Sequence, residues 1–227
     1  MLSSYGFYAI FGILTLVSYW VNQNLQKKMT KYGSVPLPFS GKDVAERMLR
    51  ENGINDVKVV STGGALTDHY NPGNKTVNLS TVVYDQRTIT AAAVAAHECG
   101  HAVQHATGYA ALKMRSALVP AVNFSNKITP WVLTIGVFLV ETFPALLGIG
   151  IVLFSVTALF SLITLPVEIN ASQRAVAWLD KSGITDANTK PMVVDALKSA
   201  AYTYVIAAVS SLATVLHYVL ILMNRRR

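Results

Sequence analysis

The sequence predicts an α+β fold, namely a mainly helical membrane protein with about four transmembrane helices and a small domain that carries a short β-sheet. Hydrophobic residues make up 52% of the 227 residues, charged residues only 14%, and the mean hydropathy is +0.40. A soluble domain would hold more charge. Four apolar stretches reach the roughly 20 residues that cross a bilayer. A polar stretch after the first of them alternates as strands do.

The apolar stretches divide the chain into membrane and polar segments. The first lacks a basic start and an Ala-x-Ala cleavage site, so it predicts a retained anchor rather than a signal peptide. The break at 141–144 makes the second and third stretches a tight hairpin. The expected spans are 5–21, 118–140, 145–165 and 201–223. The expected segments are an N-terminal transmembrane anchor (1–22), a polar domain (23–116), a transmembrane hairpin (117–166), a polar helical segment (167–200), and a C-terminal membrane helix with a basic tail (201–227).

Local signals predict the elements of the polar part. Ser40 with Asp43 three residues later predicts a capped helix over 41–51. Asn71-Pro-Gly-Asn74 is a turn sequence, so the strands on either side should form a hairpin. The other elements expected are a linker over 32–39, strands over 56–61, 65–70 and 75–80, and helices over 88–107 and 166–183.

One pentapeptide, His97-Glu98-Cys99-Gly100-His101, carries recognisable chemistry. Residues four apart lie on one helix face, so His97 and His101 can bind one metal ion together. Glu98 can take a proton from a metal-bound water, which is the His-Glu-x-x-His arrangement of zinc peptidases. Gly100 weakens a helix by roughly 1 kcal/mol relative to Ala, so we expect another backbone or a substrate close to it. Cys99 is the only cysteine, which excludes an internal disulfide, and we expect it to be a small filler.

A third metal ligand is expected, because catalytic zinc sites usually have three protein ligands. His105 lies one turn beyond His101 and fits a cleft position better than a ligand position, and Thr107 stands where the metzincin spacing would place the third histidine. Glu141 is expected on the other side of the membrane. Glu168 is the best candidate, because the chain crosses the membrane twice after His101 and returns to the same side. The alternative for Glu168 is an acid at the start of a helix near the lipid headgroups.

Several stretches also match the motifs of a known family: Leu66-Thr-Asp-His-Tyr70, the polar strand before Tyr84, Val94 to Gln104, and Leu165 to Ala175. In these stretches the chain resembles the bacterial membrane-bound neutral zinc metallopeptidases of the YugP type, and the resemblance covers nearly its whole length. It implies a zincin-like domain with a gluzincin site, in which His97, His101 and Glu168 bind one Zn²⁺ and Glu98 is the general base. More distant membrane peptidases, of the prenyl-protein and heat-shock type, have an Asp four residues after the third ligand. This chain has Ser172 there, which leaves open what orients the first histidine.

The expected function is therefore that of an integral-membrane zinc endopeptidase. The strand over 75–80, if it lies at a sheet edge, could bind an extended peptide by strand addition. Two alternatives stay open: a catalytically silent scaffold that keeps zinc for structure, and a zinc hydrolase of non-peptide substrates. Structural zinc sites are usually rich in Cys, which disfavours the scaffold. The candidates for contacts around the site or in the substrate cleft are His69, Tyr70, Tyr84, His105, Ser172 and Arg174.

The net charge of +7 predicts contact with lipid rather than with nucleic acid, because the basic residues flank apolar stretches. The expected location is the cell membrane, with several spans. Lys and Arg concentrate in the polar segments and are absent from the 141–144 break, so the positive-inside rule places the active site in the cytoplasm. Arg225, Arg226 and Arg227 disagree with this rule if the last span crosses fully.

Overall fold

The computed structural model describes residues 4–64 and 66–224, which form two compact units. Unit 1 contains the chain up to Tyr19, Lys113–Leu165 and the chain from Thr203. Unit 2 contains Trp20–Leu112 and Pro166–Tyr202. Arg225, Arg226 and Arg227, which bear on the expected topology, lie outside the described residues.

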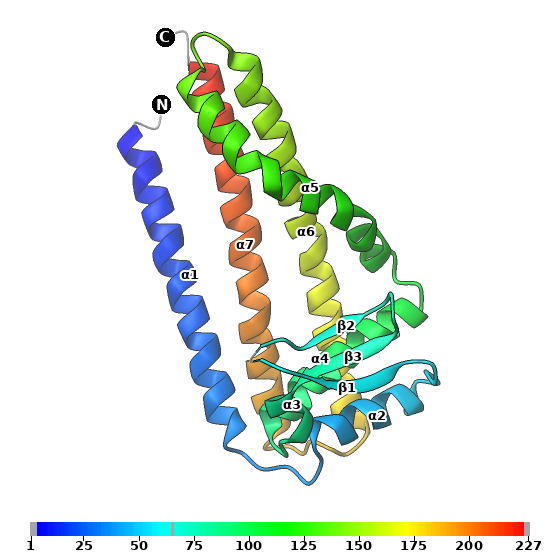
Figure 1. Ribbon diagram of the computed structural model, residues 1–227. Helices are drawn as coiled ribbons and strands as arrows, with labels where there is room; N and C mark the ends of the chain where they lie inside the picture. The colour runs from blue at the N-terminus through cyan, green and yellow to red at the C-terminus, as the bar shows by residue number, and fades with distance from the viewer. Residues whose placement is uncertain (1–3, 65, 225–227) are drawn as a thin grey trace. The chain divides into compact units, whose positions relative to one another are not determined.

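The described residues are mostly helical, with one small sheet, as predicted (Figure 1). The helices are α1 (Ser4–Gly33), α2 (Gly41–Glu51), α3 (Thr81–Asp85), α4 (Ile89–Ala106), α5 (Ala110–Phe138), α6 (Pro144–Lys181) and α7 (Lys190–Asn224), and the strands are β1 (Lys58–Thr62), β2 (His69–Asn71) and β3 (Thr76–Ser80). Within the described chain two helices, α6 and α7, are long and apolar enough to cross a membrane. The expected spans over 5–21 and 118–140 lie in α1 and α5 and stay predictions.

Helix α6 corrects the expected boundary at Pro166. A separate helix was expected from 166, but α6 runs from Pro144 to Lys181 without a break and holds Pro166 in its interior. Proline removes one backbone hydrogen bond from a helix, and the packing of the buried residues Val167, Glu168 and Ala171 holds the helix through that local loss. Glu168 therefore lies in mid-helix, and its alternative reading as an acid at a helix start is wrong.

Helix α4 has nearly the bounds expected from the motif, with Thr88 and Thr107 as its cap residues, and forms the centre of unit 2. Thr88 caps it by accepting a hydrogen bond from the Ala91 backbone N–H at 3.2 Å. Its alanines at 91, 92, 93, 95 and 96 are buried, and these small side chains let neighbouring helices approach closely. Helix α2 packs against this face through Val44, Met48 and Leu49. Its capping box is confirmed, because Ser40 and Asp43 exchange hydrogen bonds of 2.9 and 3.1 Å.

Long-range polar contacts fix three more helices in unit 2. Trp178 of α6 donates its indole N–H to Glu51 of α2 at 2.9 Å. Asp195 of α7 accepts from Lys28 Nζ at 2.6 Å and from the Tyr32 hydroxyl at 2.7 Å. Both donors lie on α1, which continues to Gly33, so the linker expected from residue 32 begins two residues later.

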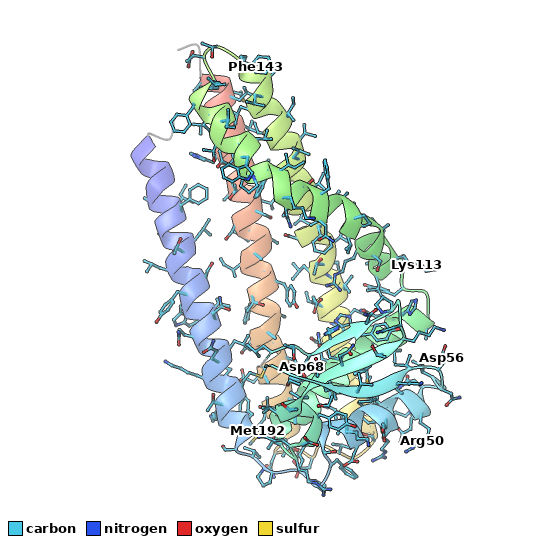
Figure 2. All side chains as sticks on the ribbon, in the orientation of Figure 1. Arg50, Asp56, Asp68, Lys113, Phe143 and Met192 are labelled. Carbon is cyan, nitrogen blue, oxygen red and sulfur yellow. The ribbon has the colours of Figure 1, made fainter. Side chains whose placement is uncertain are left out.

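The sheet has the order β1-β3-β2, with β1 parallel and β2 antiparallel to β3. The predicted hairpin around residues 71–74 is confirmed. The expectation that 75–80 is an edge strand is wrong, because β3 is the central strand. Its Val77 and Leu79 are fully buried, so it belongs inside the sheet, and the edges are β1 and β2. Asp68, labelled in Figure 2, precedes β2 and accepts hydrogen bonds from the Ser80 backbone N–H at 2.7 Å and the Ser80 hydroxyl at 3.1 Å.

Unit 1 holds the close pair formed by α5 and the first part of α6. A Cβ added to Gly136 would lie 2.8 Å from the Cα of Leu147, so the two backbones almost touch there. Thr157 on α6 donates to the side-chain oxygen of Asn126 on α5 at 3.0 Å. The rings of Phe11 in α1 and His217 in α7 meet edge to face at 5.4 Å, so His217 packs against α1.

Candidate metal centre

Helices α4 and α6 bring three potential metal ligands together. His97 and His101 lie one turn apart on α4, with ring centroids 4.9 Å apart. Glu168 on α6 places Oε2 3.2 Å from His97 Nε2 and 3.5 Å from His101 Nε2. The three ligand atoms lie within 4.8 Å of one another, and the Glu168 side chain is only 3% exposed.

The geometry of these atoms fits a zinc ion. Two imidazole nitrogens and one carboxylate are a common donor set of catalytic zinc sites. Zinc–ligand bonds of about 2.1 Å in a tetrahedron separate neighbouring ligand atoms by about 3.4 Å, and the two nitrogen–oxygen distances here are 3.2 and 3.5 Å. A buried carboxylate also needs a partner, and a metal ion between Glu168 and the two imidazoles would supply one.

The electrostatics of His101 agree with such a fit. Burial by itself would lower the pKa of His101, but the hydrogen bond to Glu168 and the negative charge of Glu98 raise it overall. The centre therefore stabilises a cation at this position.

Both histidines are oriented through their second ring nitrogen. His97 Nδ1 lies 3.1 Å from the Ser172 hydroxyl, so the residue that stands in place of the Asp of more distant peptidases does contact the first histidine. His101 Nδ1 lies 3.0 Å from Gln104 Oε1. Gln104 is fully buried, and its Nε2 donates to the Val167 backbone oxygen at 2.8 Å and to Asn170 Oδ1 at 3.0 Å.

Sequence reasoning assigned no role to Gln104 or Asn170. One signal could have found Gln104, because it follows His101 by three residues and so shares its helix face. Asn170 gives no comparable signal, because it becomes relevant only once α6 lies against α4. There it also accepts the Arg174 Nε–H at 2.8 Å.

Glu98 is held by the edge of the sheet. Its side chain is buried against β2, and Glu98 Oε2 accepts the Tyr70 backbone N–H at 3.0 Å. The Tyr70 hydroxyl lies 2.7 Å from His105 Nδ1. Two of the expected cleft residues, Tyr70 of β2 and His105 of α4, thus contact each other, and Tyr70 also contacts Glu98.

The remaining candidates have other surroundings. His69 is exposed, and its Nδ1 lies 2.7 Å from the Thr67 backbone oxygen. The Tyr84 ring lies 5.6 Å from Lys42 Nζ on α2. Arg174 contacts the metal ligands only indirectly, through Asn170 and Gln104. The structure therefore favours Tyr70 over His69 and Tyr84 as a group close to Glu98.

The neighbours of the motif have structural roles. A Cβ on Gly100 would lie 2.6 Å from the Ala171 backbone oxygen, so the close partner expected at this glycine is α6. Cys99 is fully buried and donates to the Ala45 backbone oxygen at 3.6 Å. Burial raises the pKa of the Cys99 thiol far above its usual range, in keeping with an inert filler.

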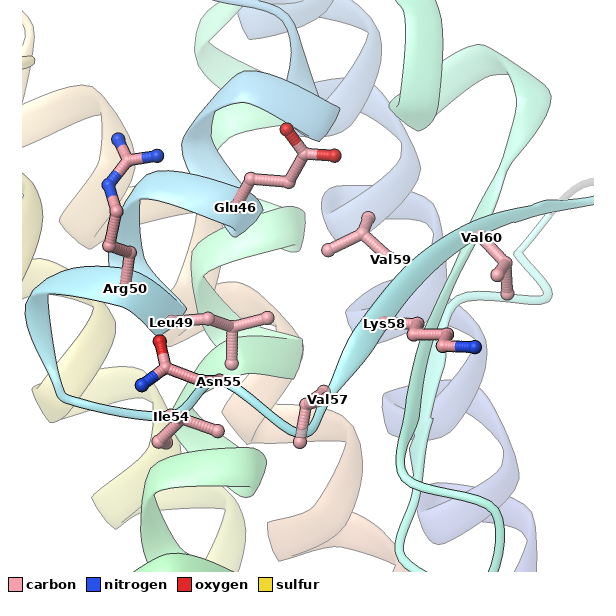
Figure 3. A pocket seen from close by; sticks show the side chains of 9 residues that line it. All are labelled: Glu46, Leu49, Arg50, Ile54, Asn55, Val57, Lys58, Val59 and Val60. Atoms are coloured by element: carbon pink, nitrogen blue, oxygen red, sulfur yellow. The ribbon is translucent and has the colours of Figure 1, made fainter.

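A separate hollow of about 440 Å³ lies between α2 and β1 (Figure 3). Its lining includes the apolar side chains of Leu49, Ile54, Val57 and Val59 and the charged side chains of Glu46, Arg50 and Lys58. None of the metal-centre residues lines it. It is therefore distinct from the candidate metal centre.

Comparison with known proteins agrees with this geometry. A family model described as "Putative neutral zinc metallopeptidase" matches residues 7–223. The chain belongs to this family. A protein of Bacillus subtilis (strain 168) named "Putative membrane protease YugP" is 42% identical over 212 residues, which cover 92% of this chain and 93% of that protein. The resemblance found in the sequence is thereby confirmed. No solved structure matches the chain.

Membership in this family supports a zinc peptidase. It agrees with the cluster of His97, His101 and Glu168, which could bind a metal ion. The name of the Bacillus relative and the two long apolar helices α6 and α7 fit association with a membrane.

Proposed function

We propose that this protein is an integral-membrane zinc endopeptidase, with His97, His101 and Glu168 as ligands of one Zn²⁺ and Glu98 as the general base. The observation that carries the proposal is the meeting of two histidines of α4 with a buried carboxylate of α6. Glu98, the neighbour of the first histidine, is held beside this group by the strand β2.

The chemistry divides between metal and protein. When bound, zinc would supply an activated water and polarise the peptide carbonyl. Glu98 would accept the proton of the attacking water on its carboxylate and pass it to the leaving amine. The Tyr70 backbone N–H would keep Glu98 Oε2 in place through this transfer. Ser172 and Gln104 would hold the two histidine rings in their binding orientation.

The edge strand β2 is the best candidate for contact with substrate. It lies at an edge of the sheet, where an extended peptide could add as a further strand. Its Tyr70 contacts both the base and His105. We assign the Tyr70 hydroxyl and His105 as the polar wall of the cleft and the first candidates to donate a hydrogen bond to the developing oxyanion.

We place the protein in the cell membrane with its active site on the cytoplasmic side, and the charge distribution of the sequence supports this side. Protein or peptide chains are the proposed substrates. The family and the name of the relative favour a peptidase over a silent zinc scaffold or a hydrolase of other substrates.

The test is a pair of measurements on purified full-length protein in detergent. Glu98→Gln should keep its zinc content, because Glu98 is not a ligand, and should lose casein hydrolysis by a factor of at least about 100. Glu46→Gln, an exposed glutamate of α2, is the matched control and should behave as wild type. An active Glu98→Gln protein would falsify the role of the base. Wild-type protein that holds zinc but cleaves no protein substrate would favour the scaffold or the non-peptide hydrolase.

A further inference from the structure

Gln104 occupies an unusual place for an uncharged polar side chain. It is fully buried in α4, and its amide makes three contacts: to His101, to the Val167 backbone oxygen and to Asn170. A buried amide is stable only if its oxygen meets a donor and its nitrogen meets acceptors. The partners of Gln104 therefore determine which way the amide points.

Two of these partners allow the Gln104 amide only one orientation. The Val167 carbonyl can only accept, so the Gln104 atom at 2.8 Å from it must be the NH₂ group. Arg174 Nε can only donate, so the Asn170 atom at 2.8 Å from it must be the oxygen, and this same oxygen accepts the second N–H of Gln104. The Gln104 oxygen is left facing His101 Nδ1 at 3.0 Å.

An amide oxygen can only accept, so His101 must carry its proton on Nδ1. In the neutral ring, Nε2 then keeps a lone pair, which points toward Glu168 Oε2, 3.5 Å away, on the side where a metal ion would bind. His97 has no such constraint, because its Nδ1 contacts the Ser172 hydroxyl, which can either donate or accept.

We infer that Gln104 is a positioning residue that fixes the tautomer of His101 and ties its ring to α6. The inference rests on the proposed zinc site and adds a role that the ligand set alone does not contain. Neutral histidine binds zinc through an unprotonated nitrogen, so an amide that holds the proton on Nδ1 keeps Nε2 ready for the metal ion. The hydrogen bond to the Val167 oxygen lies next to Glu168, so the Gln104 side chain links the ligand His101 on α4 to the ligand Glu168 on α6.

The first experiment compares zinc affinities of full-length protein in detergent, measured by competition with a chromophoric chelator. Gln104→Leu has a similar volume without the amide and should weaken zinc binding 10- to 100-fold. Gln86→Leu, the same substitution at an exposed glutamine away from the ligands, is the matched control and should keep the zinc affinity of wild type. Circular dichroism should show that both variants keep the helical content of wild type.

The second experiment reads the tautomer directly. In zinc-free wild type labelled with ¹⁵N-histidine, nitrogen chemical shifts should show His101 protonated at Nδ1. In Gln104→Leu that proton should exchange faster with water. A wild-type His101 without a proton on Nδ1 overturns the inference.

The outcomes separate this inference from the proposed function. If zinc affinity falls in His97→Ala and Glu168→Ala but stays within threefold of wild type in Gln104→Leu, the zinc site stands and the positioning role is wrong. If wild type binds no zinc, the proposed function fails and the positioning role fails with it.

Discussion

Replacing Gly100 by alanine tests how closely the metal centre depends on the contact of α4 with α6. An added Cβ would lie 2.6 Å from the Ala171 backbone oxygen, whereas ordinary contact begins at 3.4 Å. A backbone carbonyl in a helix cannot rotate away, so the two helices must separate locally by roughly 0.8 Å, the difference between these distances. Overpacking of this kind destabilises by about 1–3 kcal/mol, and the better helix propensity of alanine returns about 1 kcal/mol.

The effect on metal binding should exceed the effect on folding. Ala171 follows Glu168 by three residues on the same helix face, so a shift of α6 at Ala171 also moves the carboxylate. Metal–ligand distances tolerate only about ±0.2 Å. We therefore expect Gly100→Ala to unfold only slightly more easily than wild type, by about 1 kcal/mol, and to bind zinc at least 10-fold more weakly.

The assay is zinc competition together with thermal unfolding followed by circular dichroism. Gly12→Ala is the control, because a Cβ at Gly12 in α1 meets nothing within 4 Å. It should keep the zinc affinity and match or exceed wild-type stability. Wild-type zinc affinity in Gly100→Ala would refute the reasoning, since it would mean that the helices do not need this contact to hold the ligands.

Four further predictions concern single residues and the bound metal. Glu168→Ala should lose most of its zinc content by metal analysis, and a Glu168→Ala protein with one zinc per chain would remove this residue from the ligand set. In wild type a chelator should lower the unfolding temperature, because zinc at a thousand times its dissociation constant adds about 4 kcal/mol, whereas the chelator should leave Glu168→Ala unchanged. The backbone N–H and hydroxyl of Ser40 hold the pKa of Asp43 below its usual range. The ionised Asp43 therefore stabilises the fold fully at a pH above its pKa in the unfolded chain, near 3.9. This stabilisation is lost as the pH falls through the lower pKa of the folded protein. Asp43→Asn should therefore cost about 1 kcal/mol at pH 7 and less at pH 3 in thermal unfolding, and an equal loss at both pH values would contradict the ionised cap. Cys99 should react with a thiol reagent only on unfolding, and rapid labelling of the native protein would mean that the thiol is not buried.

The elements with local signals were predictable from the sequence. The helix over 41–51 has its capping box and the helix over 88–107 has its Thr88 cap, and both appear with nearly the expected bounds. The hairpin around Asn71-Pro-Gly-Asn74 appears for the same reason. In each case the deciding interactions lie within a few residues of one another, so a short window of sequence contains them.

The features that depend on distant segments were not predictable. Strand β3 lies in the middle of the sheet because it also pairs with β1, and no local sequence pattern predicts this pairing. The continuity of α6 through Pro166 went against a local rule, because proline usually marks a helix boundary. The role of Gln104 required α6 to lie against α4, since two of its partners are on α6. Glu168 was predicted as a ligand from the expected membrane topology and the family resemblance, and not from its spacing to the histidines.

The proposed ligands are far apart in the order of synthesis. His97 and Glu168 are separated by 71 positions, and the apolar part of α6 lies between them. A ribosome that has finished the His-Glu-x-x-His helix has therefore made only two of the three ligands. On the proposed assignment, a nascent or truncated chain that stops before residue 168 would be an inactive protease precursor, and proteolytic competence would arise only after the hydrophobic hairpin has been translated.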